Sequence, residues 1–317
     1  APAATQLPTN HPHNTRFRTS RLDRHLALSV TADTVSRLSE VVATPILPNT
    51  PPPSPLPPSP SLPAHAFWTA NSVIDPTTGA SLEYAQLKLG ADGVEWIHAA
   101  SLEIGRLAQG IHPHMPTGSD TIHFIKHTDK PFDRKATYLR IVTSVRTNKA
   151  ESKRVRFTVG GDRVDYPGET STPTVDLTTI KIQLNSVLST PDAKFMTADI
   201  SDFYLNTPLP RKEYMRIPVK DIPQCVIDQY NLAPLVHNGH VMTEIRKGMY
   251  GLPQAGLLAH DLLKDRLALD GYMPANHTPG FFSHSTLPIS FTLCVDDFGI
   301  KYVGTDAAQH LIATLKK

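Results

Sequence analysis

The chain has 317 residues, a formal net charge of +2 and 40% hydrophobic residues, which is enough for about two folded domains. Its two cysteines are too few for a disulfide framework, and its fifteen histidines lack the paired cysteines of a zinc finger. The near-neutral charge does not by itself indicate a nucleic-acid-binding protein.

The first 66 residues differ in composition from the rest of the chain. Residues 44–63, "TPILPNTPPPSPLPPSPSLP", are about half proline. Proline fixes φ and removes a backbone donor, so this run predicts an extended polyproline-type linker. The preceding "NTRFRTSRLDRHLALSV" is basic, and we interpret it as disordered. We therefore predict a disordered basic and proline-rich linker over 1–66 and an ordered domain over 67–317.

The next part of the chain predicts two helices and a pair of strands. Residues 81–110 have helical spacing, with Gly110 as the expected end. Residues 136–148 and 153–161 are short β-branched runs, which predict strands joined by a charged turn. Residues 174–189 predict a second helix. The predicted inward-facing residues are Trp96, Ala100, Ile104 and Leu107 in the first helix, and Leu177, Ile180, Leu184 and Val187 or Leu188 in the second.

The C-terminal part predicts a strand, a helix and a hairpin. Residues 194–200, "KFMTADI", predict a short strand that ends on an aspartate. Residues 252–272 have the clearest helical pattern, and residues 289–304 alternate on both sides of two adjacent aspartates, as in a β-hairpin. This order of elements favours an α+β fold over a regular βαβ series. The predicted inward-facing residues of the helix are Leu258, Leu262 or Leu263, and Leu267.

A basic strip lies between Lys130 and Arg163. It contains ten basic residues and few acids. Such a strip can bind phosphates even in a chain of near-neutral charge. The alternative is a solvated face that acids elsewhere balance.

Three carboxylates are candidates for a metal site. Asp199 ends a predicted strand, and Asp296 and Asp297 lie at the tip of the predicted hairpin. If these elements are neighbours in one sheet, the carboxylates converge at its end. Such a cluster is costly unless cations neutralise it, and Mg²⁺ suits oxygen ligands. Two such ions about 4 Å apart serve phosphoryl transfer, whereas the alternative is a plain polar turn.

Five segments resemble, in order, motifs of the reverse transcriptase domain of copia-type LTR retrotransposons. The resemblance covers about Ser81 to Lys317 and implies a right-hand polymerase, with fingers and a palm of antiparallel sheet and packed helices. The segments are "RVRFTVGGDRVDYPGETSTPTVDLTTIKIQL", "MTADISDFYLNTPL", "KGMYGLPQAGLLAHDLL", "HTPGFFSH" and "CVDDFGIKYVG".

The resemblance also implies roles for individual residues. Two Mg²⁺ ions, for which Mn²⁺ can substitute, would be held by the catalytic residues Asp199, Asp296 and Asp297. Arg156 and Arg154 would neutralise the triphosphate of the incoming nucleotide, as guanidinium groups do.

Two further residues have both a functional and a plain structural interpretation. Tyr204 would be the aromatic gate that packs under the sugar and excludes a 2′-hydroxyl, or it is an ordinary core aromatic. Gln254 would contact the incoming nucleotide or the template, or it merely lies near a helix N-terminus. Lys247 and Lys301 are interpreted as surface charges.

The sequence also departs from the family. Cys294 stands where a tyrosine commonly precedes the Val-Asp-Asp motif, and "TVGGD" replaces a more basic segment. The sequence ends 20 residues after Asp297, before the thumb and RNase H domain that the family would continue into. These departures put the activity of this chain by itself in doubt.

Three functional hypotheses follow. The first is an RNA-directed DNA polymerase that joins dNTPs to a primer 3′-hydroxyl. The second is a degenerate or domesticated retroelement fragment that is catalytically inactive and at most binds nucleic acid. The third is a protein kinase, suggested by Asp297-Phe298-Gly299, but the sequence lacks a glycine-rich loop and a His-Arg-Asp catalytic loop. An aspartic protease is weaker still, because no Asp-Thr-Gly or Asp-Ser-Gly occurs.

The expected partners are an RNA or DNA template with its primer, dNTPs and other retroelement polyprotein products. No apolar run approaches the ~20 residues that cross a membrane, and the N-terminus has no hydrophobic signal core. We therefore expect an intracellular protein, in cytoplasmic virus-like particles and also in the nucleus, with no membrane partner.

Overall fold

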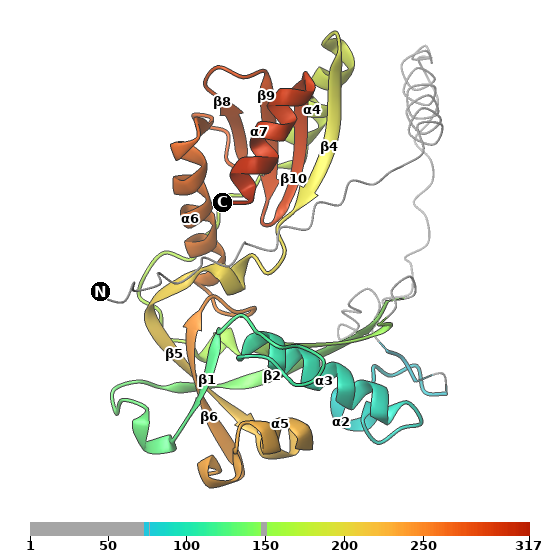
Figure 1. Cartoon of the computed structure of the whole chain (residues 1–317), viewed down its shortest axis with the longest axis vertical. Helices are drawn as coiled ribbons and strands as arrows, with labels where there is room; N and C mark the ends of the chain where they lie inside the picture. The colour runs from blue at the N-terminus through green and yellow to red at the C-terminus, as the bar shows by residue number, and fades with distance from the viewer. Residues whose placement is uncertain (1–72, 76, 147–150) are drawn as a thin grey trace, which may run out of the picture. The chain divides into compact units, whose positions relative to one another are not determined.

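The computed structural model describes residues 73–75, 77–146 and 151–317. The predicted linker over 1–66 and the predicted domain start at residue 67 lie outside these ranges. The described residues form two five-stranded sheets with packed helices, which confirms the α+β class (Figure 1). No helix among them is both long and apolar enough to span a bilayer.

The first sheet has the strand order β1-β6-β5-β2-β3. Its neighbours pair antiparallel except β2 and β5, which are parallel. The predicted pair of strands is confirmed as β2 and β3. The strands of this sheet are β1 (Ile122–Ile125), β6 (His240–Lys247), β5 (Pro208–Pro218), β2 (Ala136–Val145) and β3 (Lys153–Val159). Helices α2 (Tyr84–Leu87), α3 (Gly93–Leu107) and α5 (Gln224–Gln229) contribute residues to its core, as does Ala255.

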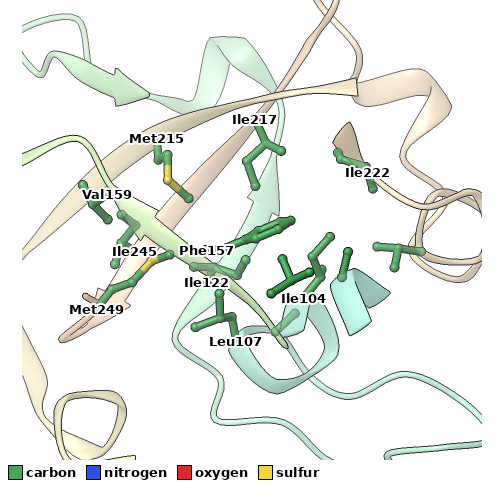
Figure 2. Packing of buried hydrophobic residues seen from close by; sticks show 14 of the residues in the cluster. Ile104, Leu107, Ile122, Phe157, Val159, Met215, Ile217, Ile222, Ile245 and Met249 are labelled. Carbon is green, nitrogen blue, oxygen red and sulfur yellow. The ribbon is translucent and has the colours of Figure 1, made fainter. Parts of the chain in front are cut away.

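Helix α3 packs on the first sheet through the side that the sequence predicts. Its inward residues Trp96, Ala100, Ile104 and Leu107 are buried. Figure 2 shows Ile104 and Leu107 beside Phe157 of β3 and Ile122 of β1. The predicted helix over 81–110 is broken after α2, where the backbone of Gly93 packs on Lys88. A Cβ on Gly93 would lie 2.4 Å from the Lys88 carbonyl oxygen, so a side chain does not fit there.

The second sheet has the order β4-β10-β9-β8-β7, and all its neighbours are antiparallel. The predicted strand, helix and hairpin are confirmed as β4, α6 and β9–β10. The strands are β4 (Ala193–Asp199), β10 (Asp297–Val303), β9 (Ile289–Cys294), β8 (Phe281–His284) and β7 (Tyr272–Pro274). The helices that pack on it are α4 (Leu177–Ser189), α6 (Ala255–Leu269) and α7 (Thr305–Leu315).

Short 3₁₀ turns occur along the whole described chain. They are η1 (His127–Asp129), η2 (Gly161–Arg163), η3 (Tyr204–Asn206), η4 (Val219–Asp221) and η5 (Ala233–Leu235).

The two faces of the second sheet are covered differently. On one face, Phe298 and Ile300 of β10 join a buried cluster with residues of α6 and α7. The predicted inward residues Leu263 and Leu267 of α6 belong to this cluster. On the other face lies α4, as the hydrogen bonds from its Gln183 to β9 and β10 show.

The predicted inward side of α4 is wrong in part. Leu177 and Leu188 are 65% and 59% exposed, and Leu184 is also exposed. The buried residue of this helix is Gln183. Its amide donates to the carbonyls of Ser290 (3.2 Å) and Gly299 (2.9 Å), so α4 contacts the sheet through polar rather than apolar groups.

Candidate functional site

The two adjacent aspartates lie in a two-residue hairpin turn. Cys294 pairs with Asp297, so Val295 and Asp296 form the turn. Val295 has φ 61°, a value that the first central residue of a II′ turn adopts and that a β-branched residue rarely takes. Backbone strain of this kind persists where the surrounding structure imposes it, often at functional sites.

The strand register brings the backbone positions of the three predicted carboxylates close together. Asp297 of β10 lies directly opposite Asp199, the last residue of β4. Directly opposite residues of an antiparallel pair project from the same face of the sheet. The Ile200 N–H donates to the Asp296 carbonyl at 3.2 Å, which joins the turn to the chain leaving β4. The backbone thus brings the three residues to one corner of the second sheet.

Asp296 is the carboxylate whose ionisation the surroundings disfavour. Burial raises its pKa, and the charges of Asp199 and Asp297 raise it further. Arg156, on β3 of the first sheet, acts in the opposite direction. A carboxylate near other carboxylates and one guanidinium is the arrangement that an additional cation would stabilise.

The donor set fits Mg²⁺ in chemistry and in backbone placement. Carboxylate oxygens are the ligands that this hard cation prefers. Asp199 and Asp297 supply them from opposite positions of two paired strands, and Asp296 supplies them from the turn. Among the described residues, however, no three Asp, Glu, His or Cys side chains are gathered as a group that could hold a metal ion. Asp297 is exposed, and Asp199 and Asp296 are half-buried.

Tyr204, the predicted gate, is close enough to Asp296 for the charge of that carboxylate to affect its phenol. It begins η3, five residues after Asp199, and is half-buried. Burial raises the pKa of its phenol, and the charge of Asp296 adds to that effect. Tyr204 also packs against the buried clusters of both sheets. The gate and the core interpretations are therefore both compatible with its position.

Tyr250 links Tyr204 to the predicted phosphate-binding arginine, and sequence reasoning missed it. The rings of Tyr204 and Tyr250 meet edge to face, with centroids 5.1 Å apart. The Arg156 guanidinium carbon lies 4.6 Å from the Tyr250 ring centroid, a cation–π contact. The signal in the sequence is the aromatic residue between two glycines within "KGMYGLPQAG".

The arginines of β3 form a strip of like charge. Burial lowers the pKa of Arg154, and the neighbouring charges of Arg156 and Arg146 lower it further. The Nε of Arg156 is buried and has no hydrogen-bond partner. Repulsion within the strip and an unsatisfied donor are both relieved when an anion such as a phosphate binds.

A buried glutamate holds this arginine strand against α3. The Phe157 N–H of β3 donates to Glu103 at 3.2 Å, and Glu103 also pairs with Arg106 at 2.8 Å. Arg106 in turn pairs with Asp202, which follows β4. Burial lowers the pKa of Arg106, but Glu103 and Asp202 outweigh burial and hold that pKa above its usual value. This network connects β3 to the chain segment that leaves Asp199.

Gln254 is not brought to the surface of the site. Its side chain is buried at the N-terminus of α6, and its amide nitrogen lies 3.3 Å from Glu213. Glu213 is also paired with Arg134 and Arg211. A contact of Gln254 with a nucleotide or template stays a prediction, and in this structure its amide is engaged by Glu213.

Glycines allow close backbone contacts on both sides of Tyr250. Gly251 has φ 93°, and a Cβ there would lie 2.1 Å from the Val159 carbonyl oxygen at the end of β3. A Cβ on Gly248 would lie 2.6 Å from the Tyr204 carbonyl oxygen. The Val159 N–H donates to the Tyr250 carbonyl at 2.8 Å. This spacing of glycines thus sets Tyr250 between β3 and Tyr204.

No protein family and no curated protein sequence matches this chain.

Proposed function

We propose that the chain is the fingers and palm of a copia-type RNA-directed DNA polymerase, which transfers a nucleotidyl group from a dNTP to a primer 3′-hydroxyl. The observation that carries the proposal is the strand register, which sets Asp297 opposite Asp199 with Asp296 next to it in the turn. The proximity of Arg156 and Tyr204 to Asp296 supports it further.

The proposed reaction forms one bond and breaks one bond. The primer 3′-oxygen bonds to the α-phosphorus, the bond from that phosphorus to the bridging oxygen breaks, and pyrophosphate leaves. Asp199, Asp296 and Asp297 would hold two Mg²⁺ ions, which would stabilise the charge on the attacking and leaving oxygens when bound. Arg156 and Arg154 would bind the triphosphate and orient it for in-line attack.

Tyr204 would set the choice of sugar. Its ring is held from the side by Tyr250, so it cannot easily move away from a 2′-hydroxyl that approaches it. A fixed aromatic ring under the sugar discriminates by steric exclusion, which favours dNTPs over NTPs. Tyr250 and Tyr204 together would then align the triphosphate and the sugar of one nucleotide.

The alternative is an inactive retroelement fragment that only binds nucleic acid. The observation that favours it is that, in the part of the chain that the structure describes, no three ligand-type side chains are gathered to hold a metal. Cys294, where the family commonly has tyrosine, points the same way.

Primer extension on an RNA template with Mg²⁺ tests the proposal. We expect incorporation by the wild-type chain, a loss of at least about a hundredfold in Asp296→Asn, and no change in Asp265→Asn, which alters an exposed aspartate of α6. Equal incorporation by all three would overturn the role of Asp296. No incorporation by the wild type, together with salt-sensitive binding of nucleic acid, would favour the alternative.

A further inference from the structure

An open groove of about 650 Å³ lies on the first sheet, and none of the predicted site residues lines it. Its walls are the loop before β2, the η2 turn and the face of β5 and β6 that carries Arg216 and Met242. Arg216 of β5 pairs in register with Met242 of β6, and both line the groove. Met215 and Ile217, the neighbours of Arg216, are in the buried cluster, so the groove lies on the face away from that core.

The groove carries an excess of positive charge. Two acidic residues, Asp162 and Asp165, line it, against five basic residues: Lys130, Arg134, Lys135, Arg163 and Arg216. Arg134 is partly neutralised by Glu213 at 2.6 Å, but Glu213 is shared with Arg211. Lys135, Arg163 and Arg216 are exposed. A concave surface with such an excess concentrates a positive potential that attracts polyanions.

Aromatic rings stand among these cations. The Arg163 guanidinium carbon lies 5.0 Å from the ring centroid of Tyr138, which stacks the cation on the ring. Phe132, which is 103% exposed, lies in the loop between the groove-lining residues Lys130 and Arg134. Lys130 holds this loop by donating to the carbonyls of Pro131 and Arg134, so Phe132 is presented at the tip of a braced turn.

Phe132 is fully exposed and has no role in the packing of the described residues. Its full exposure costs hydrophobic free energy in water, and that cost is recovered when a flat apolar partner covers it. Separated cations together with exposed aromatic rings are what single-stranded nucleic acid requires, since its phosphates bind the cations and its unpaired bases stack.

We propose that this groove is a binding site for single-stranded nucleic acid, with the phosphodiester backbone on Lys135, Arg163 and Arg216 and a base stacked on Phe132. The site recognises the strand without sequence preference, because every base has a face that can stack. It does not depend on the proposed transfer reaction, since the two sites share no residue.

Binding of labelled single-stranded RNA and DNA of about 15 nucleotides to the full chain, without Mg²⁺ or dNTP, tests the proposal. Fluorescence anisotropy gives the Kd over a series of salt concentrations. We expect Lys135→Glu and Arg216→Glu each to weaken binding about tenfold and to reduce the salt slope by about 1. The matched control is Lys194→Glu, which reverses an exposed lysine of β4 and should bind as the wild type does.

The stacking contact has a readout that charge alone would not change. Phe132→Ala should weaken binding about tenfold, whereas Leu89→Ala, at an apolar side chain that is 84% exposed, should not. In Phe132→Trp, bound oligonucleotide should quench the added fluorescence, and polyglutamate should not. Wild-type affinity in Lys135→Glu, Arg216→Glu and Phe132→Ala would overturn the proposal, as would equal binding of polyglutamate. Equal effects on RNA and DNA would support it, and an effect on only one of them would restrict it to that nucleic acid.

Discussion

The surroundings of Asp296 disfavour its ionised form, and this opposes folding at neutral pH. Its ordinary pKa is 3.8, and burial and the neighbouring aspartates raise the pKa in the folded chain. Between these two values the folded state holds more protons than the unfolded state, so stability falls as pH rises through that window. Above the window the folded chain carries an ionised, half-buried carboxylate, which a bound divalent cation would offset.

Replacement of Asp296 should therefore separate stability from activity. We expect Asp296→Asn to raise the melting temperature at pH 7 while removing incorporation, and to leave it unchanged below pH 3. Mg²⁺ should raise the melting temperature of the wild type and not that of Asp296→Asn. Calorimetry at both pH values checks this, with Asp265→Asn as control. A lower melting temperature of Asp296→Asn than of the wild type at pH 7 would contradict the claim that the ionised Asp296 carboxylate destabilises the fold.

In the proposed site, Tyr250 would act on a nucleotide through Arg156 rather than by direct contact. Tyr250→Phe keeps the ring under the guanidinium, and Tyr250→Leu removes it. We expect Tyr250→Leu to lose about 1 kcal/mol, or about fivefold, in dNTP affinity, and Tyr250→Phe to bind as the wild type does. Equilibrium binding of dNTP with Ca²⁺ measures this without turnover. If both variants bound equally weakly, the hydroxyl rather than the ring would be responsible.

At the scale of single elements, α4 is held on the second sheet by polar groups. Besides Gln183, Lys301 of β10 donates to the hydroxyls of Ser186 (2.7 Å) and Thr190 (2.8 Å). Lys301 is thus a tether of the helix as well as a surface charge. This attachment is made by the strand that carries Asp297, so it holds the hairpin from the face opposite to the apolar cluster.

Loss of the Gln183 amide should loosen this helix. Gln183→Ala leaves a cavity and removes two hydrogen bonds to strand carbonyls, so we expect a loss of about 1–3 kcal/mol in the free energy of unfolding. Asn185→Ala, at an exposed position of the same helix, should change it by less than about 0.5 kcal/mol. Urea denaturation compares the two. Similar midpoints for both variants would show that the apolar contacts of α4 suffice.

The elements that the sequence predicts are those whose core is apolar and periodic. The inward side of α3 and the alternation around Asp296 are predicted correctly because their apolar residues recur at the helical and strand periods, although α3 also buries Ser101 and Glu103. The side of α4 was misread because its contact with the sheet is an amide. Strands β5 and β6 were not predicted, since β5 buries Glu213 between Arg134 and Arg211 and so lacks a clean alternation. Ion pairing of this kind is visible only in three dimensions.

At the scale of the described chain, one short segment contacts both buried clusters. Met249 and Leu252 are buried in the cluster of the first sheet, and Tyr204, which packs against both clusters, lies against Gly248. The sequence placed the carboxylates in one sheet, but it did not indicate that residues 248–252 would bring Arg156 to them. That contact depends on the close approach of the backbones of β3 and residues 248–252. The hydrophobic periodicity of the sequence carries no information about such an approach.

Substitution of Gly251 tests the close contact between residues 248–252 and β3. Gly251→Ala adds a methyl group 2.1 Å from the Val159 carbonyl oxygen and forces a side chain into φ 93°. Gly239→Ala also has positive φ, at 72°, but has nothing within 4 Å, so it measures the backbone strain alone. We expect a loss of about 1–2 kcal/mol for Gly239→Ala and of at least about 3 kcal/mol for Gly251→Ala. Because Gly251→Ala also moves β3 relative to Tyr250, its dNTP affinity should fall, whereas Gly239→Ala should keep the wild-type affinity. Equal losses of stability in the two variants would show that the close contact between Gly251 and β3 adds nothing to stability. The claim that residues 248–252 hold Arg156 near Asp296 would then be wrong.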